Sequence, residues 1–243
     1  YAGKTYVEEM GITSKSWLDK KPSVAHLEEN DLHRLPKRAS HSNKGTFGKL
    51  LIIAGSLNMA GAAIFAAKAA YRSGVGLVKV LTQEDNRCVL QEAVPEAIIS
   101  TYGNTLNREQ LISEIHWADA IVIGPGLGQS AISKKLVTLV QETASVPVVW
   151  DADGLNILSE NTQSLLMPHT EYIMTPHLGE FSRLSNHSIE FIQNHLIDSA
   201  VDFARMYDVI CVLKDFHTVI ANPYGLSFLN LTGNNGMATA GSG

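Results

Sequence analysis

The chain has 243 residues, enough to bury a substantial core as one large α/β domain or as two small ones. Its 24 acidic and 19 basic residues give a net charge of −5, which argues against a nucleic-acid partner because such a surface needs clustered basic residues. The two cysteines, Cys88 and Cys211, lie far apart and suit neither a disulfide framework nor a thiolate metal site. Both adjoin apolar runs, so we expect buried thiols in a reducing, cytoplasmic setting.

The first segment, residues 1–40, is charged and weakly patterned, with Pro22 and Pro36 as breaks. We predict that it is a linker, or the remnant of an upstream domain, with one short helix near residues 26–33. Residues 41–243 are predicted to form the main domain.

Residues 50–67 carry no charge and are long enough to raise the question of a membrane span. Gly55, Ser56, Asn58 and Gly61 interrupt this segment, and alanine is more frequent in it than leucine. We therefore predict a buried strand followed by a buried helix, and no association with a membrane.

The rest of the chain alternates between strand-like and helix-like patterns. Residues 50–54 form a continuous apolar run, typical of a parallel strand covered on both faces. Residues 107–117 place Leu111, Ile112 and Ile115 at helical spacing. The predicted strands are residues 50–54, 76–82, 96–100, 119–123, 146–150, 172–174, 209–214, 217–221 and 226–230, and the predicted helices include residues 60–72, 107–117, one ending at 140, and 188–207. This alternation predicts an α/β fold with a mostly parallel sheet and two antiparallel strands at its end.

The turns that follow the predicted strands carry the candidate functional groups, because ligands of such sheets bind outside the carboxyl ends of the strands. Five turns are expected to converge on one edge: residues 55–56, 124–128, 151–156, 175–180 and 214–218. The turn at residues 124–128 lacks the G-x-G-x-x-G spacing of a dinucleotide fingerprint. It serves either as backbone that faces a ligand or as a tight turn between a strand and a helix.

Charged side chains at two strand ends each allow two interpretations. Asp151 and Asp153 either hold a metal ion or its waters, or Asp153 caps the helix that follows. Lys214 either contacts a phosphate as a point charge or forms a salt bridge to Asp215 or Asp208.

A histidine and a glutamate lie three residues apart at a predicted helix start. His177 either contacts a polar substrate or caps the helix, and Glu180 either acts through a hydrated Mg²⁺ or favours the helix dipole. The uncharged segment 231–243 ends in Gly241-Ser242-Gly243, and a helix that begins there would present free N–H groups to an anion. The alternative is a frayed tail. Glycine turns, carboxylates, a lysine and an anion-binding helix start together suit phosphoryl transfer.

Eight motifs, in this order along the chain, resemble the ADP/ATP-dependent NAD(P)H-hydrate dehydratase family of the ribokinase-like superfamily. They are KGTFG at 44–48, AGS at 54–56, MAGA at 59–62, RSGVGLV at 72–78, VIGPGLG at 122–128, DADGLN at 151–156, TPHLGEF at 175–181 and LTGNNGMATAGSG at 231–243. The resemblance implies a ribokinase-like three-layer αβα fold. It also implies repair of hydrated NADH or NADPH, in which ADP or ATP phosphorylates the hydrate hydroxyl and elimination of phosphate regenerates the nicotinamide cofactor.

The resemblance also implies site residues, a metal and partners. Ala62, Gly126 and His177 would contact the hydrate, and Glu180 falls where related kinases place the acidic residue associated with Mg²⁺. The adenine nucleotide would lie against Lys214, Asp215, Phe216, His217, Thr218 and Gly243. A glycine or alanine is commoner in the family at the positions of Asp215 and Phe216. A homo-oligomer is expected, together with a fused or separate hydrate epimerase domain. Residues 4–12 faintly resemble the end of such a domain.

One departure concerns the end of the chain. In the family, an aspartate that activates the hydroxyl follows the Gly-Ser-Gly motif, and this sequence stops at Gly243 before it. Because a general base must reach the proton that it removes, we expect the chain as written to be an inactive fragment without its catalytic residue. Two alternatives remain: a kinase of a small alcohol or vitamin precursor, and a non-catalytic nucleotide-binding module.

Overall fold

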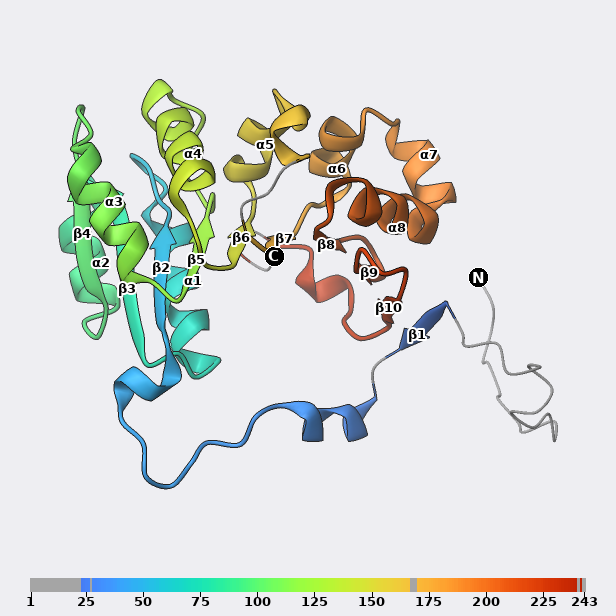
Figure 1. Cartoon of the computed structure of the whole chain (residues 1–243), viewed down its shortest axis with the longest axis horizontal. Helices are drawn as coiled ribbons and strands as arrows, with labels where there is room; N and C mark the ends of the chain where they lie inside the picture. The colour runs from blue at the N-terminus through green and yellow to red at the C-terminus, as the bar shows by residue number, and fades with distance from the viewer. Residues whose placement is uncertain (1–22, 27, 167–169, 240, 242–243) are drawn as a thin grey trace.

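A computed structural model of the chain describes residues 23–26, 28–166, 170–239 and 241. Within these residues ten strands form one sheet in the order β1-β10-β9-β8-β7-β6-β5-β2-β3-β4, with helices on its two faces (Figure 1). The expectations about residues 4–12 and Gly243 concern positions outside the described residues.

The strands are β1 (Val24–His26), β2 (Lys49–Ile53), β3 (Leu77–Gln83), β4 (Ile98–Tyr102), β5 (Ala120–Ile123), β6 (Val148–Trp150), β7 (Tyr172–Met174), β8 (Ile210–Leu213), β9 (Thr218–Ala221) and β10 (Ser227–Asn230). The α-helices are α1 (Ala60–Arg72), α2 (Arg87–Ala93), α3 (Arg108–Trp117), α4 (Ala131–Thr143), α5 (Asp153–Ser159), α6 (Leu178–Ser185), α7 (Ile189–Asn194) and α8 (Leu196–Tyr207). Short 3-10 helices are η2 (Glu29–Arg34), η3 (Lys44–Phe47), η4 (Glu84–Asn86), η5 (Thr162–Leu165) and η6 (Asn235–Met237).

Strands β2 to β8 pair in parallel, whereas β9 is antiparallel to both of its neighbours, β8 and β10. Where two strands consecutive in the chain pair in parallel, a helical crossover joins them, as parallel strands require. Strand β1 comes from the segment predicted to be a linker, and it pairs in parallel with β10 at the sheet edge. The α/β class and the mostly parallel sheet are therefore confirmed.

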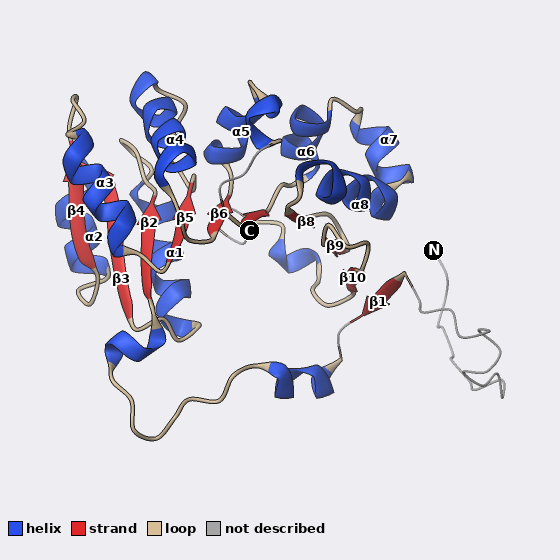
Figure 2. Cartoon of the chain, in the orientation of Figure 1, coloured by secondary structure: helices blue, strands red, loops and turns tan. Residues whose placement is uncertain are grey.

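The two faces of the sheet carry separate apolar cores. Figure 2 shows helices (blue) on both sides of the strands (red). Alternation along β2 sends Leu51 and Ile53 to one face and Ile52 to the other. Helices α3 to α8 pack on the first face. On the second face α1 and α2 cover β2, β3 and β4, and fully buried alanines at positions 63 and 67 let α1 lie close to the sheet. The chain thus has the three-layer αβα arrangement expected from the sequence.

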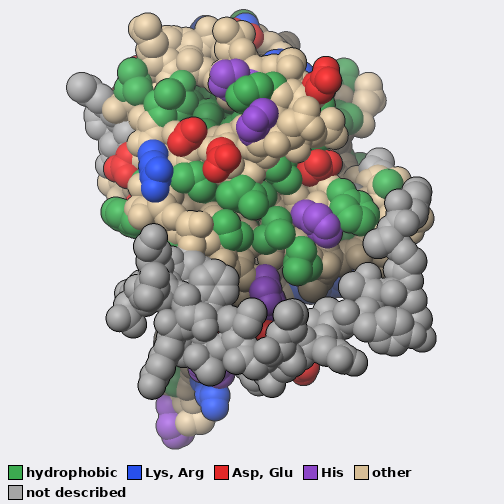
Figure 3. Space-filling view, turned by 90° about the vertical axis from the view of Figure 1, so that its right-hand side faces the viewer, with side chains coloured by type: hydrophobic (Ala, Val, Ile, Leu, Met, Phe, Trp, Pro, Cys, Tyr) green, Lys and Arg blue, Asp and Glu red, His purple; other side chains and the backbone are tan. Residues whose placement is uncertain are grey.

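Helices α7 and α8 form the end of the first-face layer that lies at the right of Figure 1 and faces the viewer in Figure 3. Hydrophobic side chains, acidic side chains and histidines are intermixed there (Figure 3). The rings of His187, Phe191 and His195 follow one another along this end, with centroid separations of 4.8 and 4.5 Å.

The single helix predicted over residues 188–207 is two helices in the structure, α7 and α8, which meet at His195.

Two other expectations need correction or confirmation. Cys211 is fully buried, and burial raises the pKa of its thiol, but Cys88 is exposed, so the expectation of two buried thiols is wrong for Cys88. The apolar segment at residues 50–67 forms β2 and the first half of α1, as predicted. Among the described residues, the structure contains no helix with the length and apolar character needed to cross a membrane.

Candidate functional site

The five turns singled out in the sequence meet at the carboxyl edge of β2, β5, β6, β7 and β8. Gly55 N–H donates to the carbonyl of Pro125 at 2.9 Å, which joins the turns after β2 and β5. His177 and Lys214 form an isolated parallel bridge that joins the turns after β7 and β8. The predicted convergence of these turns is confirmed.

An apolar cavity of about 690 Å³ opens between α1 and the second face of the sheet at this edge. We call it the apolar cavity. Its lining includes Ala62, Gly126, Asp151, Thr175 and Gly241. Two of the three residues expected to contact the hydrate therefore share one cavity, and the tail preceding Gly243 reaches it.

Glycines set the shape of the turn at residues 124–128. Gly126 has φ +60°, and a Cβ atom there would lie 2.8 Å from the Cβ of Ala62. Gly124 has φ +124°, and a Cβ atom there would lie 1.8 Å from the carbonyl oxygen of Asp151. Only glycine therefore allows this turn to approach α1 on one side and the end of β6 on the other.

The two aspartates at the end of β6 point to different partners. The N–H of Gly154 donates to the carbonyl of Asp151 at 2.9 Å, and Ala152 between them has φ +47° and ψ −117°, the first central position of a type II′ turn. The Asp153 carboxylate accepts the N–H of Gly128 at 2.8 Å. The alternative in which Asp153 caps a helix is wrong, because Asp153 is already the first residue of α5.

Lys214 forms an ion pair with Asp151, which the sequence did not suggest as its partner. Its Nζ donates to Asp151 Oδ1 at 3.1 Å, so the partner is neither Asp215 nor Asp208. The hydroxyl of Thr175 donates to the same oxygen at 2.7 Å. The sequence did not predict this pairing or the role of the Thr175 side chain. The available signal was that Thr175 and Asp151 each follow a predicted strand.

His177 and Glu180 form a capping box at the start of α6. The N–H of Gly179 donates to His177 Nδ1 at 2.9 Å, and the N–H of His177 donates to Glu180 Oε2 at 2.9 Å. Because Nδ1 is an acceptor, the proton of the neutral imidazole is on Nε2, which lies 3.3 Å from Glu180 Oε1. The helix-cap alternative is thus confirmed for both residues, and their contacts with a substrate and a metal stay predictions.

A second cavity, of about 440 Å³, begins at Asp215, the residue after Lys214, and we call it the polar cavity. Phe216 is 82% exposed, and its ring meets the His217 ring edge to face at 4.6 Å. The lining consists of Asp215, Phe216, His217, Thr218, Asn230, Leu231, Thr232, Gly233, Asn234, Asn235, Met237 and Ala238. Four of the residues expected against the nucleotide therefore line one cavity, next in sequence to Lys214.

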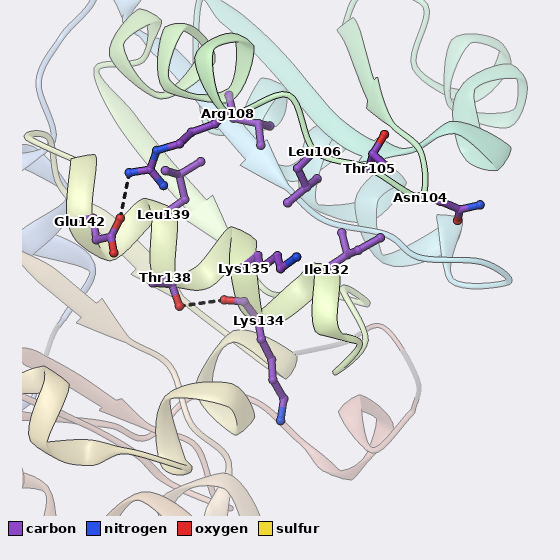
Figure 4. A pocket seen from close by; sticks show the side chains of 11 residues that line it. Asn104, Thr105, Leu106, Arg108, Ile132, Lys134, Lys135, Thr138, Leu139 and Glu142 are labelled. Atoms are coloured by element: carbon purple, nitrogen blue, oxygen red, sulfur yellow. Dashed lines mark hydrogen bonds and ion pairs between the residues drawn. The ribbon is translucent and has the colours of Figure 1, made fainter.

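A third cavity, of about 590 Å³, lies between α4 and the segment that leads into α3 (Figure 4). None of the predicted site residues lines it. Two of its basic side chains are already paired, Arg108 with Glu142 at 3.1 Å and Lys134 with Glu160 at 2.6 Å. This cavity is therefore not the predicted site.

The described residues include no group of three or more His, Cys, Asp and Glu side chains placed to hold a metal ion. Carboxylates at the edge are nevertheless hard oxygen donors, the chemistry that Mg²⁺ prefers. Mg²⁺ is commonly held by one or two carboxylates together with phosphates and water, so Glu180, Asp151 and Asp153 fit that ion once a nucleotide is present.

Comparisons with known proteins agree on one family. Residues 50–243 match the family model described as NAD(P)H-hydrate dehydratase. The chain is 36% identical over 244 residues to the bifunctional NAD(P)H-hydrate repair enzyme of Escherichia coli, a match that covers 99% of this chain and 45% of that protein. The chain spans about half the length of such bifunctional relatives.

Two solved structures share the fold. The ADP/ATP-dependent NAD(P)H-hydrate dehydratase of Bacillus subtilis, co-crystallised with ATP and Mg²⁺, superposes with a TM-score of 0.76 at 33% identity, covering 90% of this chain and 76% of that one. A ribokinase-like superfamily protein of Enterococcus faecalis superposes with a TM-score of 0.81 at 28% identity, covering 91% and 76% of the two chains.

Proposed function

Because the chain belongs to the NAD(P)H-hydrate dehydratase family, we propose that it repairs hydrated NADH or NADPH with ADP or ATP as co-substrate. The nucleotide transfers a phosphoryl group to the hydroxyl of the hydrate. The phosphate then leaves with the electron pair of the carbon–oxygen bond, the ring loses a proton, and the dihydronicotinamide is restored.

The hydrated ring lies in the apolar cavity, against Ala62 and Gly126, with His177 at the same edge of the sheet. Ala62 and Gly126 both line this cavity, and neither carries a large side chain that would fill it. The His177 side chain is 57% exposed and its Nε2 lies 3.3 Å from Glu180 Oε1, so a polar group of the substrate that binds there meets this pair.

The adenine nucleotide lies in the polar cavity, against Asp215, Phe216, His217 and Thr218, and Gly243, which is outside the described residues, stays an expected contact of the nucleotide. Lys214 contacts the phosphates as a compact positive charge. Glu180 holds Mg²⁺ through water, and the ion neutralises charge on the phosphates when it is bound.

One observation carries this proposal: the ion pair between Lys214 and Asp151, at 3.1 Å, links the end of β8 to a residue that lines the apolar cavity, and we call this pair the junction. Asp151 lines the apolar cavity, and Lys214 directly precedes the residues that line the polar cavity. A phosphoryl group that passes from nucleotide to hydrate must cross this junction, and positioning and charge neutralisation supply most of the catalysis of such a transfer.

The domain, location and assembly of the protein are proposed by analogy with its family. Residues 41–243 form the catalytic domain, and the protein acts in the cytoplasm as a homo-oligomer. The bifunctional relatives support a second repair activity, such as a hydrate epimerase, in the same or a separate chain.

The test uses the protein expressed from its natural gene, incubated with hydrated NADH, ADP or ATP, and Mg²⁺. Recovery of NADH absorbance that requires nucleotide is the expected result. Accumulation of a phosphorylated product without recovery would indicate the kinase alternative. Binding of ATP with neither reaction would indicate the non-catalytic module.

A further inference from the structure

The carboxylate of Asp151, which lines the apolar cavity, accepts hydrogen bonds from two side chains. Its Oδ1 accepts a hydrogen bond from Lys214 Nζ at 3.1 Å and another from Thr175 Oγ1 at 2.7 Å. The side chains of Lys214 and Asp151 are 29% and 20% exposed, so solvent screens this pair less than an ion pair on the open surface.

The backbones that carry this pair are held firmly. The N–H of Lys214 donates to the carbonyl of Pro176 at 2.8 Å, which extends the ladder between β7 and β8 by one residue. The N–H of Asp151 donates to the carbonyl of Ile123 at 3.1 Å, and the type II′ turn at Ala152 fixes the direction in which the chain leaves Asp151. The mobile part of the arrangement is therefore the four-carbon stem of Lys214, which has many rotamers when nothing holds its ammonium.

We infer that Asp151 is a positioning residue, which holds the Lys214 ammonium at the junction so that it meets the phosphates of a bound nucleotide without first being ordered. Thr175 fixes the carboxylate by donating to the same oxygen. An ammonium group has three donors, so Lys214 can bind a phosphate and keep Asp151. The inference rests on the proposed function, because it needs a nucleotide phosphate beside Lys214.

Two opposite effects of Asp151 on nucleotide binding make the inference testable. Ordering a long side chain in advance strengthens binding on the order of three- to tenfold. A carboxylate that merely lies near phosphates repels them, and its removal would tighten binding instead. The sign of the change in affinity therefore distinguishes positioning from simple proximity.

The experiment is a double-mutant cycle on the 243-residue chain, with the dissociation constant of ATP measured by titration calorimetry in the presence of Mg²⁺. The variants are Asp151→Asn, Lys214→Met and the double variant. Thr175→Val removes the bond to Oδ1, and Thr175→Ser should restore it. Glu114→Gln is the matched control, because it removes another half-buried carboxylate that pairs with a lysine, Lys79, far from this edge.

The expected results are a loss of ATP affinity of about three- to tenfold in Asp151→Asn, a larger loss in Lys214→Met, and no further loss in the double variant. Thr175→Val should lose less than Asp151→Asn, and Glu114→Gln should bind ATP like the unchanged chain. Melting temperatures of all variants show whether each one is folded.

Three outcomes would overturn the inference. If Asp151→Asn binds ATP equally well or more tightly while Lys214→Met binds weakly, Asp151 does not position Lys214, and the nucleotide site itself stands. If the losses from Asp151→Asn and Lys214→Met add, Asp151 acts by another route. If the unchanged chain does not bind ATP, the nucleotide site of the proposed function fails and the inference fails with it.

Discussion

The apolar cavity and the polar cavity differ in how they are built. In the apolar cavity the shape is set by backbone and by side chains that touch, since a Cβ atom on Gly124 or Gly126 would collide with Asp151 or Ala62. In the polar cavity the side chains stand in solvent, and Phe216 is 82% exposed. The difference indicates that the apolar cavity has its shape before any ligand binds, whereas the polar cavity, where we propose that the nucleotide binds, would gain contacts with its ligand.

The largest effect is expected at the turn that builds the apolar cavity. Gly124→Ala places a Cβ atom 1.8 Å from the carbonyl of Asp151 at a φ of +124°, so backbone must move. We expect the free energy of unfolding to fall by about 3 kcal/mol or more in urea denaturation. The control is Gly61→Ala, where a Cβ atom within α1 meets nothing within 4 Å. That change should stabilise the chain by about 0.5–1 kcal/mol, and a Gly124→Ala protein as stable as this control would contradict the rigid turn.

Alkaline pH should weaken the sheet, because buried phenols lie on strands β4 and β7. Burial favours the neutral phenol and raises the pKa of Tyr172, in β7, and of Tyr102 from 10.0 to about 12. Because both pKa values are raised, this stabilisation is fully present below pH 10 and is lost as the pH rises from 10 to about 12. Ionisation of each phenol then lowers the free energy of unfolding by about 2 kcal/mol.

The measurement is urea denaturation at a series of alkaline pH values. Tyr172→Phe removes one of the two phenols, so its stability should fall less steeply between pH 10 and 12 than that of the unchanged chain. Identical slopes for the two proteins would contradict the assignment to Tyr172.

A smaller effect on stability, with a clear effect on the ligand, is expected at Gly126. Gly126→Ala puts a side chain at φ +60° and 2.8 Å from the Cβ of Ala62. We expect a loss of about 1–2 kcal/mol in stability from the left-handed backbone, together with weaker binding of hydrated NADH and little change in ATP affinity. Adding Ala62→Gly should recover part of the hydrate affinity, and a double variant no better than Gly126→Ala would show that the contact between these residues is unimportant.

The smallest effect on folding is expected in the polar cavity. Phe216→Ala should change the stability by less than about 0.5 kcal/mol, because an 82% exposed ring packs on little in the free protein. Its ATP affinity should still fall, by about fivefold, if the ring packs on bound adenine. Calorimetry and thermal melting check the two halves of this prediction, and a large drop in stability would show that the nucleotide side is also built in advance.

The sequence predicted the framework well because its signals are local. Apolar runs such as residues 50–54 mark strands, and the glycines at 124, 126 and 128 mark a turn that needs positive φ. Parallel strands place their carboxyl ends together, so the convergence of the turns followed from the fold class.

The sequence did not predict which side chains pair at the carboxyl edge of the sheet, because such pairs depend on the order and register of strands that are far apart in the chain. Lys214 and Asp151 are 63 residues apart, and they meet only because β6, β7 and β8 lie side by side in this order. The type II′ turn at Ala152 was also hidden, since alanine is uncommon at a position with positive φ. Helices α2 and α5, each of 7 residues, are too short to show a helical period.

The most direct measurement is a crystal structure of the chain with ATP, Mg²⁺ and NADPH. We predict adenine against Phe216 and His217, the terminal phosphate at Lys214 while Lys214 keeps Asp151, and the nicotinamide in the apolar cavity against Ala62 and Gly126. Adenine nucleotide bound elsewhere, for example in the cavity between α3 and α4, with Lys214 far from every phosphate, would contradict it.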